Sequence, residues 1–378
     1  MKLILAPDSY KGTISSAKAI EILAETAEEV FGTCDIVKIP IADGGEGTVN
    51  ALVAAMGGRI EIAPAHDAAG NEIDVPFGVI GQDCAVVEMA LSAGLTQIPL
   101  NSRDPLLLSS YGFGETLSKV LELGYKRILI GIGGSATNDG GMGMLTALGA
   151  KFYHSGKLLS GKGEDLEAVD DVDLSGLNPK WHVAKVSVFC DVTNPLLGEN
   201  GATYVYGPQK GATGETLKRL EAGMANYANI ILEKTGIDIR YIKGAGAAGG
   251  VGAALGGILK AEISSGIEAM LNEIEFDKKL NGADLVITGE GRLDSQSVKY
   301  GKAPIGIAKR CATKGIPILI IAGILGEGWE DALKIQGCKV IATTDKPLTE
   351  EEIMNGASGR YKNAAKKALE EFQSSLKK

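Results

Sequence analysis

Five times along this chain an apolar, strand-like stretch leads directly into a loop of glycines, carboxylates and small hydroxyl residues. The five loops are residues 6–12, 42–48, 133–141, 191–194 and 289–294. In open α/β sheets, ligands bind beyond the carboxyl ends of the strands, so acidic, glycine-rich sequence at such positions is typical of a binding site. The repetition of the pattern predicts an α/β fold in which several loops line one shared site.

Both ends of the chain carry the alternation of strand and helix that is typical of a parallel sheet. Strands are predicted at 3–6 and 36–41, and again at 284–288, 316–322 and 339–343. Two or three strands alone would make an unusually small sheet, but the five strands together make a sheet of ordinary size. We therefore predict a discontinuous α/β domain built from residues 1–58 and 284–378, although two consecutive domains would also fit the chain length.

Residues 59–283 do not follow the regular alternation of strand and helix seen at the two ends, and they are predicted to form an inserted second domain. Short alternating runs at 59–63, 72–76 and 84–89 indicate antiparallel strands separated by turns. Buried strands at 127–132 and 186–190 and helices at 106–123, 215–235 and 247–259 follow, which makes this a mixed-sheet α/β domain.

Composition excludes several classes of function. The net charge of −9 and pI near 5.1 argue against nucleic acid as a partner, because a basic stripe would be expected. Five cysteines lie far apart without a C-x-x-C pair, which is typical of reduced thiols in the cytoplasm. The apolar run 3–6 is too short for a signal peptide. The longest uncharged stretch, 244–259, falls short of the roughly 20 apolar residues of a membrane span, so we expect a soluble, cytoplasmic protein.

Several catalytic motifs are missing from the sequence. It contains no Walker-type G-x-x-x-x-G-K-[ST], no H-E-x-x-H and no G-x-S-x-G. Residues 244–249 match G-x-G-x-x-G, but no acidic residue follows about 20 positions later to bind a ribose. Close helix packing is the better interpretation of these glycines. A dehydrogenase for a small hydroxy acid therefore rests on one weak motif.

The loop 133–141 combines four glycines with Ser135, Thr137, Asn138 and Asp139 at the predicted start of a helix. Backbone N–H groups at such a start bind anions, so a phosphate or a substrate carboxylate would suit it. An equally good interpretation is a capped turn, with Asn138 or Asp139 as the N-cap.

The remaining loops supply carboxylates and cations. Asp43 and Glu46 stand among glycines, and Asp191 is followed by Asn194. Such oxygens bind Mg²⁺ together with substrate phosphates, although each alone could be a turn or cap. In combination with the charged residues of the first and last loops they predict phosphoryl transfer, which needs charge neutralisation and an orienting base. A non-catalytic protein that binds small acids is the remaining alternative.

The motifs taken together resemble the bacterial class I glycerate kinases. They are APDSYKG at 6–12, ADGGEGT at 42–48, GIGGSATNDGG at 131–141, CDVTNPLLG at 190–198, GPQKGA at 207–212, GAGAAGG at 244–250 and TGEGRLD at 288–294. They occur in order over nearly the whole chain, so chance is a poor explanation. One mild departure is Tyr10, where phenylalanine is common.

The resemblance implies ATP-dependent, Mg²⁺-assisted phosphorylation of D-glycerate to a phosphoglycerate, with 2-phosphoglycerate favoured over 3-phosphoglycerate. It also implies a flavodoxin-like parallel-sheet domain built from both termini, an inserted α/β domain of mixed sheet, and an active site in the cleft between them. The partners would be D-glycerate and ATP, with no nucleic acid and no membrane, and a homo-oligomer is compatible with the sequence.

Residue roles follow as hypotheses. Asp191 or Asp43 would orient or deprotonate the attacked hydroxyl, and Lys11 and Arg292 would balance the charge of the transferred phosphoryl group. The predicted substrate and phosphate contacts are Asp8, Ser9, Gly44, Gly45, Gly133, Gly134, Ser135, Thr137, Asn138, Asp139, Asn194 and Arg292. The predicted metal ligands are Glu46, Glu290 and Asp294.

Overall fold

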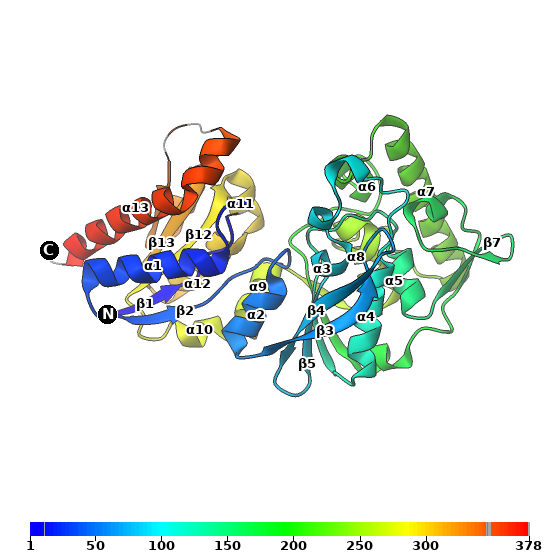
Figure 1. Ribbon diagram of the computed structural model, residues 1–378, viewed down its shortest axis with the longest axis horizontal. Helices are drawn as coiled ribbons and strands as arrows, with labels where there is room; N and C mark the ends of the chain where they lie inside the picture. Colours follow the sequence, from blue (N-terminus) through cyan, green and yellow to red (C-terminus); the bar gives the residue numbers. More distant parts are fainter. Residues whose placement is uncertain (11, 345, 347–348, 377–378) are drawn as a thin grey trace. The chain divides into compact units, whose positions relative to one another are not determined.

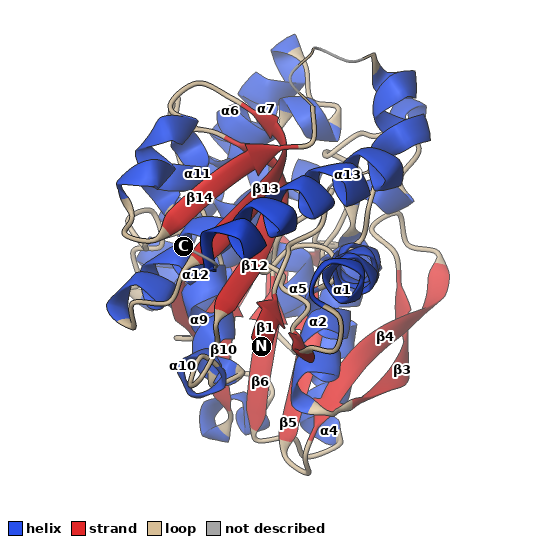
Figure 2. Cartoon of the chain, turned by 90° about the vertical axis from the view of Figure 1, so that its left-hand side faces the viewer, coloured by secondary structure: helices blue, strands red, loops and turns tan. Residues whose placement is uncertain are grey.

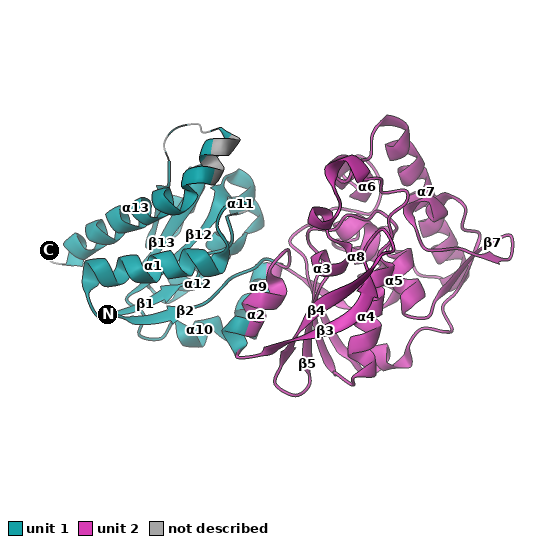
Figure 3. Cartoon of the chain, viewed as in Figure 1, with its two compact units in different colours: residues 1–43, 54–56, 267–378 teal, residues 44–53, 57–266 magenta. Residues whose placement is uncertain are grey.

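The chain divides into two compact units, shown in Figure 3. They are described from a computed structural model that covers residues 1–10, 12–344, 346 and 349–376. Unit 1 comprises Met1–Asp43, Ala54–Met56 and Ile267–Lys378, and unit 2 comprises Gly44–Val53 and Gly57–Gly266. The domain limits given above, 1–58 with 284–378 and 59–283, and the site expected between those domains stay predictions.

Unit 1 is built on a five-stranded parallel sheet to which both ends of the chain contribute (Figure 1). Its strands are β1 (Lys2–Leu5), β2 (Asp35–Lys38), β12 (Leu285–Leu293), β13 (Ile318–Leu325) and β14 (Cys338–Ala342). They lie in the order β14-β13-β12-β1-β2, and every neighbouring pair is parallel. Counted along the chain, this is the order 2-1-3-4-5 of flavodoxin-like folds. The predicted parallel sheet from both termini is confirmed.

Helices cover both faces of this sheet (Figure 2). They are α1 (Ser16–Phe31), α9 (Gly266–Glu273), α10 (Phe276–Lys279), α11 (Ser295–Tyr300), α12 (Ala303–Thr313) and α13 (Glu350–Leu376), with the 3-10 turn η8 (Trp329–Lys334). Leu3, Leu5 and Ile287 share one buried cluster with α1 and α13. Because side chains alternate along a strand, the buried residues Ile4 and Val286 face the other side, where α12 packs against β12 and β13.

Unit 2 contains a six-stranded mixed sheet in the order β11-β10-β6-β5-β4-β3. Its strands are β3 (Arg59–His66), β4 (Glu72–Ile80), β5 (Cys84–Glu88), β6 (Arg127–Gly131), β10 (Lys185–Phe189) and β11 (Glu262–Ser264). The pairs β3–β4 and β4–β5 are antiparallel and the others are parallel. A separate three-stranded sheet consists of β7 (Lys151–His154), β8 (Lys157–Leu158) and β9 (Asp171–Asp173). The expected mixed sheet is confirmed.

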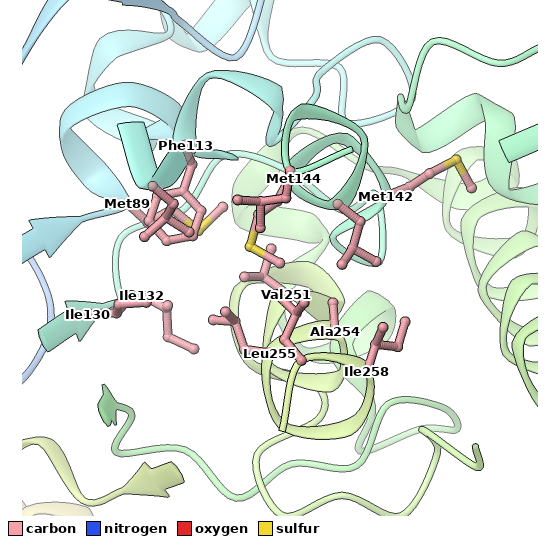
Figure 4. Packing of buried hydrophobic residues seen from close by; sticks show 14 of the residues in the cluster. Met89, Phe113, Ile130, Ile132, Met142, Met144, Val251, Ala254, Leu255 and Ile258 are labelled. Atoms are coloured by element: carbon pink, nitrogen blue, oxygen red, sulfur yellow. The ribbon is translucent and has the colours of Figure 1, made fainter. Parts of the chain in front are cut away.

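The large apolar core of unit 2 receives residues from α3 (Ala90–Ala93), α4 (Tyr111–Glu122), α5 (Met142–Ala147), α7 (Gly214–Thr235) and α8 (Val251–Ala253). Unit 2 also contains α6 (Ala202–Tyr206) and most of α2 (Thr48–Met56), whose last turn belongs to unit 1. Figure 4 shows Phe113, Met144 and Val251 meeting in this core, all fully buried. The core therefore fixes α4, α5 and α8 around the loops that follow β6.

Three sequence predictions are wrong in detail. The helix predicted for 247–259 is broken into the 3-10 turn η6 (Ala247–Gly250), α8 and the π-helical turn η7 (Ala254–Ile258), because Ala248 and Gly249 have left-handed backbone angles. The helix predicted from residue 106 begins at Tyr111. The loop predicted at 289–294 is mostly strand, because β12 stays paired with β13 as far as Leu293.

In the part of the chain that the structure describes, no helix is long and apolar enough to cross a membrane.

Candidate functional site

The carboxyl ends of β1 and β12 form the topological switch point of the unit 1 sheet. After β1 the chain continues to β2 on one side, and after β12 it continues to β13 on the other. The amide of Asp8, just beyond β1, donates to the carbonyl of Gly289 on β12 at 2.9 Å. In open α/β sheets the crevice at such a point is where ligands bind.

A cavity of about 360 Å³ lies at this point of unit 1. Its lining combines acidic, basic and hydroxyl groups: Asp8, Asp43, Glu290, Arg292, Lys302, Arg360, Ser9, Thr13, Thr343 and Thr344. Tyr10, Tyr361 and Ile324 add apolar surface. Four predicted loop residues, Asp8, Ser9, Asp43 and Arg292, are thus brought together with Glu290, whereas Lys11 lies outside the described residues.

Glu290 is a buried acid of this cavity with a strongly raised pKa. Its side chain is almost fully buried, and burial raises its pKa to about 7, with Asp294 and Asp43 adding to the effect and Ser297 and Lys302 opposing it. Its Oε1 atom accepts no hydrogen bond from any described residue. A buried carboxyl oxygen without a donor is costly, so Glu290 is placed to take a cation or a ligand proton.

Asp294 is engaged locally. Its Oδ1 accepts from the amides of Gln296 at 3.0 Å and Ser297 at 3.2 Å, which caps α11. Its Oδ2 accepts from Nε of Arg292 at 3.1 Å. The capping interpretation therefore accounts for Asp294, while Arg292 also lines the cavity.

In unit 2, the loops before α2 and after β6 lie against one another. The amide of Gly133 donates to the carbonyl of Gly44 at 2.9 Å, and a Cβ on Gly133 would lie 2.7 Å from Cα of Gly45. Glu46 lies beside Gly134, and its Oε1 accepts from Thr96 Oγ1 at 3.1 Å. Two of the five glycine-rich loops, 42–48 and 133–141, thus contact each other in unit 2 through residues 44–46 and 133–134.

Glu88 holds the first of these loops and was missed by the sequence reasoning. Its two carboxyl oxygens accept from the amides of Gly47 at 3.0 Å and Val49 at 3.1 Å. The side chain is buried, and burial raises its pKa. Glu88 ends a strand without a glycine beside it, so the sequence carries no local signal for this role.

Asp139 tests the capped-turn interpretation of loop 133–141. Its Oδ2 accepts from the amide and the hydroxyl of Ser110, both at 2.7 Å, and its Oδ1 accepts from the amide of Gly141 at 3.0 Å. The N-cap of α5 is Gly141, which has no side-chain cap, so the predicted N-cap at Asn138 or Asp139 is wrong. Asp139 nevertheless satisfies the Gly141 amide just before the helix and joins this part of the loop to Ser110.

The earlier part of the loop is different. Thr137 and Asn138 are fully buried, yet Oγ1 of Thr137 and Oδ1 of Asn138 have no hydrogen-bond partner among the described residues. The Asn138 amide nitrogen donates to Thr203 Oγ1 at 3.2 Å. Polar atoms buried in this way call for an explanation, and a bound ligand is one of the few available.

Lys210, at the end of the 3-10 turn η5 (Pro208–Lys210), contacts residues 135–137 of this loop. Its Nζ donates to Ser135 Oγ at 2.8 Å and to the carbonyl of Thr137 at 2.6 Å. Its side chain is only 2% exposed, and burial lowers its pKa to about 7. The sequence reasoning gave Lys210 no role; its one signal was the segment GPQKGA.

Asp191 and Asn194 follow β10 and are also engaged. Oδ1 of Asp191 accepts from the amide of Gly266 at 2.7 Å and from Ser265 Oγ at 3.0 Å. Oδ1 of Asn194 accepts from the Tyr206 hydroxyl at 2.7 Å. Both side chains thus fix neighbouring backbone and loops within unit 2.

The glycine motif at 244–249 packs against the polar loop. Gly140 donates to the carbonyl of Gly249 at 2.9 Å, and a Cβ on Gly249 would lie 2.1 Å from the carbonyl oxygen of Thr137. The motif therefore allows close packing, as predicted, but through backbone with left-handed angles at Ala248 and Gly249 and not through a regular helix.

Among the residues with described placement, no group of three or more His, Cys, Asp and Glu side chains is arranged to hold a metal ion. The predicted metal ligands divide between the units: Glu46 in unit 2, Glu290 and Asp294 in unit 1.

Comparisons with known proteins agree along the chain. The model of the Glycerate kinase family matches residues 3–373. The Escherichia coli K12 protein named glycerate 2-kinase is 43% identical over 327 residues, which is 86% of each chain. The Bacillus cereus glycerate kinase is 39% identical over 368 residues, covering 97% of this chain and 96% of its own. A solved structure from Salmonella typhimurium LT2, provisionally named glycerate kinase 2, has a TM-score of 0.86 at 38% identity and covers all of both chains.

Proposed function

The chain belongs to the glycerate kinase family, and on that premise we propose that it transfers a phosphoryl group from ATP to D-glycerate, giving 2-phosphoglycerate and ADP. The observation that carries this proposal is the cavity at the switch point of unit 1, where three carboxylates and three cationic side chains converge. Phosphoryl transfer needs this combination, because the protein contributes positioning and charge stabilisation and little covalent chemistry.

We assign the transferring phosphoryl group to the unit 1 cavity. Arg292, Lys302 and Arg360 line it and would balance the charge of phosphate oxygens. The hydroxyls of Ser9 and Thr13 would add donors. Lys302 and Arg360 were not singled out from the sequence and join Arg292 in this role.

Asp43 is the better supported of the two candidate bases. It lines the cavity together with Glu290, whereas Asp191 is not among the described residues that line it. A base must lie within hydrogen-bond reach of the hydroxyl that it orients. We therefore propose that Asp43 orients or deprotonates the attacked hydroxyl and that Asp191 positions the backbone at Gly266.

The residues of the cavity fit a magnesium ion. Mg²⁺ is usually held by one or two carboxylates together with substrate phosphates, and the buried Oε1 of Glu290 has no donor among the described residues. Glu290 would hold the ion, which would neutralise charge on the phosphate oxygens when bound. Glu46 and Asp294 are less suited, because their oxygens already accept hydrogen bonds from Thr96 and from Arg292 and the α11 amides.

The acid is assigned to the loops of unit 2. Gly44, Gly45, Gly133 and Gly134 bring two backbones together there, and Ser135, Thr137 and Asn138 follow with hydroxyl and amide groups. These groups would bind the carboxylate of glycerate.

A cytoplasmic location completes the proposal, since all five cysteines are free thiols. The possible homo-oligomer stays a prediction.

The product distinguishes the finer parts of this proposal. The enzyme is incubated with ATP and either D-glycerate or L-glycerate, and the phosphorylated product of each reaction is identified by ³¹P and ¹H NMR. Phosphate on the hydroxyl next to the carboxylate, formed from the D-isomer, is the expected result. A terminal phosphate would overturn the 2-phosphoglycerate assignment, and equal turnover of the L-isomer would overturn the stereochemical one.

A further inference from the structure

The Lys210 ammonium group is buried among neutral acceptors. Its two described partners are the Ser135 hydroxyl and the Thr137 carbonyl, at 2.8 and 2.6 Å. No described carboxylate forms an ion pair with it, and Asp139 acts on it only through space. A buried cation that lacks a direct counter-ion is costly, and this cost falls when an anion arrives.

The Ser135 hydroxyl supplies a donor for that anion. Because Lys210 Nζ donates to Ser135 Oγ, the oxygen is the acceptor of this bond, and its own proton is left to donate elsewhere. A hydroxyl that accepts from a cation becomes a stronger donor. Oγ1 of Thr137, fully buried two residues further on and without a partner among the described residues, supplies a second hydroxyl.

We propose that Lys210 is a positioning residue that acts through Ser135 to bind the carboxylate of the substrate acid. The proposal rests on the glycerate kinase function proposed above. The shared chemistry is that of an oxyanion, and between its two sources in the reaction, the acid and the nucleotide phosphates, the structure favours the acid. The cationic side chains suited to phosphate line the cavity of unit 1.

The proposal has a pH consequence of definite sign. With a pKa of about 7 in the free protein, Lys210 is protonated below neutrality and loses its proton above it. The charged groups near it are Asp139, whose own pKa burial raises, and Arg103, whose guanidinium donates to the carbonyls of Ile98, Leu95 and Gln209. An anion at Ser135 favours the protonated form, so binding of the acid above pH 7 takes up a proton.

The first experiment needs no variant. Binding of D-glycerate to the wild-type protein is measured by titration calorimetry at pH 6 and pH 8 in buffers of different ionisation enthalpy. The expected result is proton uptake at pH 8 that is largely absent at pH 6, together with a KM for glycerate that rises above about pH 7. Binding without proton uptake at either pH would overturn the proposal.

The second experiment compares Lys210→Met and Ser135→Ala with the exposed Lys218→Met as the control. The two test variants are expected to raise the KM for glycerate about tenfold to hundredfold, to leave the KM for ATP within about twofold, and to abolish the pH dependence of the glycerate KM. Lys218→Met should match the wild type. Thermal melting shows whether each variant is folded.

The outcomes separate the two proposals. If the KM for ATP rises in place of that for glycerate, the oxyanion is a nucleotide phosphate and the assignment to the acid is wrong. If Lys210→Met only lowers the melting temperature and keeps the pH profile of KM, the residue is merely structural. Neither result bears on the proposed glycerate kinase function. That function would be refuted if the wild-type protein released no ADP in response to glycerate.

Discussion

The amide of Gly133 donates a 2.9 Å hydrogen bond to the carbonyl of Gly44, which joins the loop after β6 to the loop before α2. The two backbones approach so closely that a Cβ on Gly133 would lie 2.7 Å from Cα of Gly45. This contact brings together two segments that are almost 90 positions apart in the sequence.

Gly133→Ala is expected to destabilise the protein by about 2 kcal/mol and to raise the KM for glycerate, because backbone atoms must move to admit the methyl group. Gly359→Ala is the matched control. Its site in α13 has open space, and alanine favours helix there by roughly 0.5–1 kcal/mol. Denaturant unfolding should show opposite signs for the same substitution; equal effects would contradict the close approach.

Glu290→Gln is expected to stabilise the metal-free protein at pH 8 while removing most activity. Burial raises the pKa of Glu290 from 4.5 to about 7, so between these values the folded state holds a proton that the unfolded state has lost. The free energy of unfolding of the wild type therefore falls across this window, by at most about 3 kcal/mol, relative to the variant. Unfolding in the presence of a chelator from pH 4 to 8 measures the difference, and a pH-independent difference would contradict the raised pKa.

Asp43→Asn is expected to lower kcat by about 100-fold or more with little change in stability, because general-base catalysis contributes roughly this much. Asp191→Asn keeps an oxygen that can accept from Gly266 and should lose less activity. Steady-state kinetics of both variants, with circular dichroism as a check on folding, tests the assignment. Near-normal turnover of both would contradict the carboxylate part of the mechanism.

Arg310→Met is expected to cost about 1–2 kcal/mol of stability without altering either KM. The Arg310 guanidinium on α12 donates to Asp277 and Glu268, each at 2.6 Å, and to Asn272 at 2.8 Å, which ties α9 and α10 to α12. Lys334→Met removes an exposed i,i+3 pair with Asp331 and should cost clearly less stability than Arg310→Met. Equal losses in urea unfolding would show that the Arg310 network adds nothing beyond a surface pair.

The sequence predicted the sheet of unit 1 well, because buried parallel strands read as short apolar runs and the count of strands at the two ends required them to be joined. It failed where tertiary packing overrides local pattern. Gly289 to Leu293 look like a loop by composition, yet pairing with β13 keeps them in a strand. The Ala/Gly run after residue 247 has helical composition, but close contact with the polar loop imposes left-handed angles at Ala248 and Gly249.

The candidate site was predicted as a set of loops, and the structure assigns some of these loops to unit 1 and others to unit 2. Asp43 ends one segment of unit 1 and Gly44 begins one of unit 2, a division that no local pattern marks. Lys210 and Glu88 were missed because their importance comes from burial. A lysine and a glutamate read as solvated charges in a sequence, and only the packed structure shows that each one holds a backbone loop.

The central claim is that the chain phosphorylates glycerate. The most direct measurement is ADP release from ATP and Mg²⁺ in a coupled assay, with D-glycerate, with L-glycerate and without acid. The account predicts ADP release that depends on D-glycerate, saturates with it, and is largely lost in Asp43→Asn. ADP release at the no-acid rate with either isomer would contradict it.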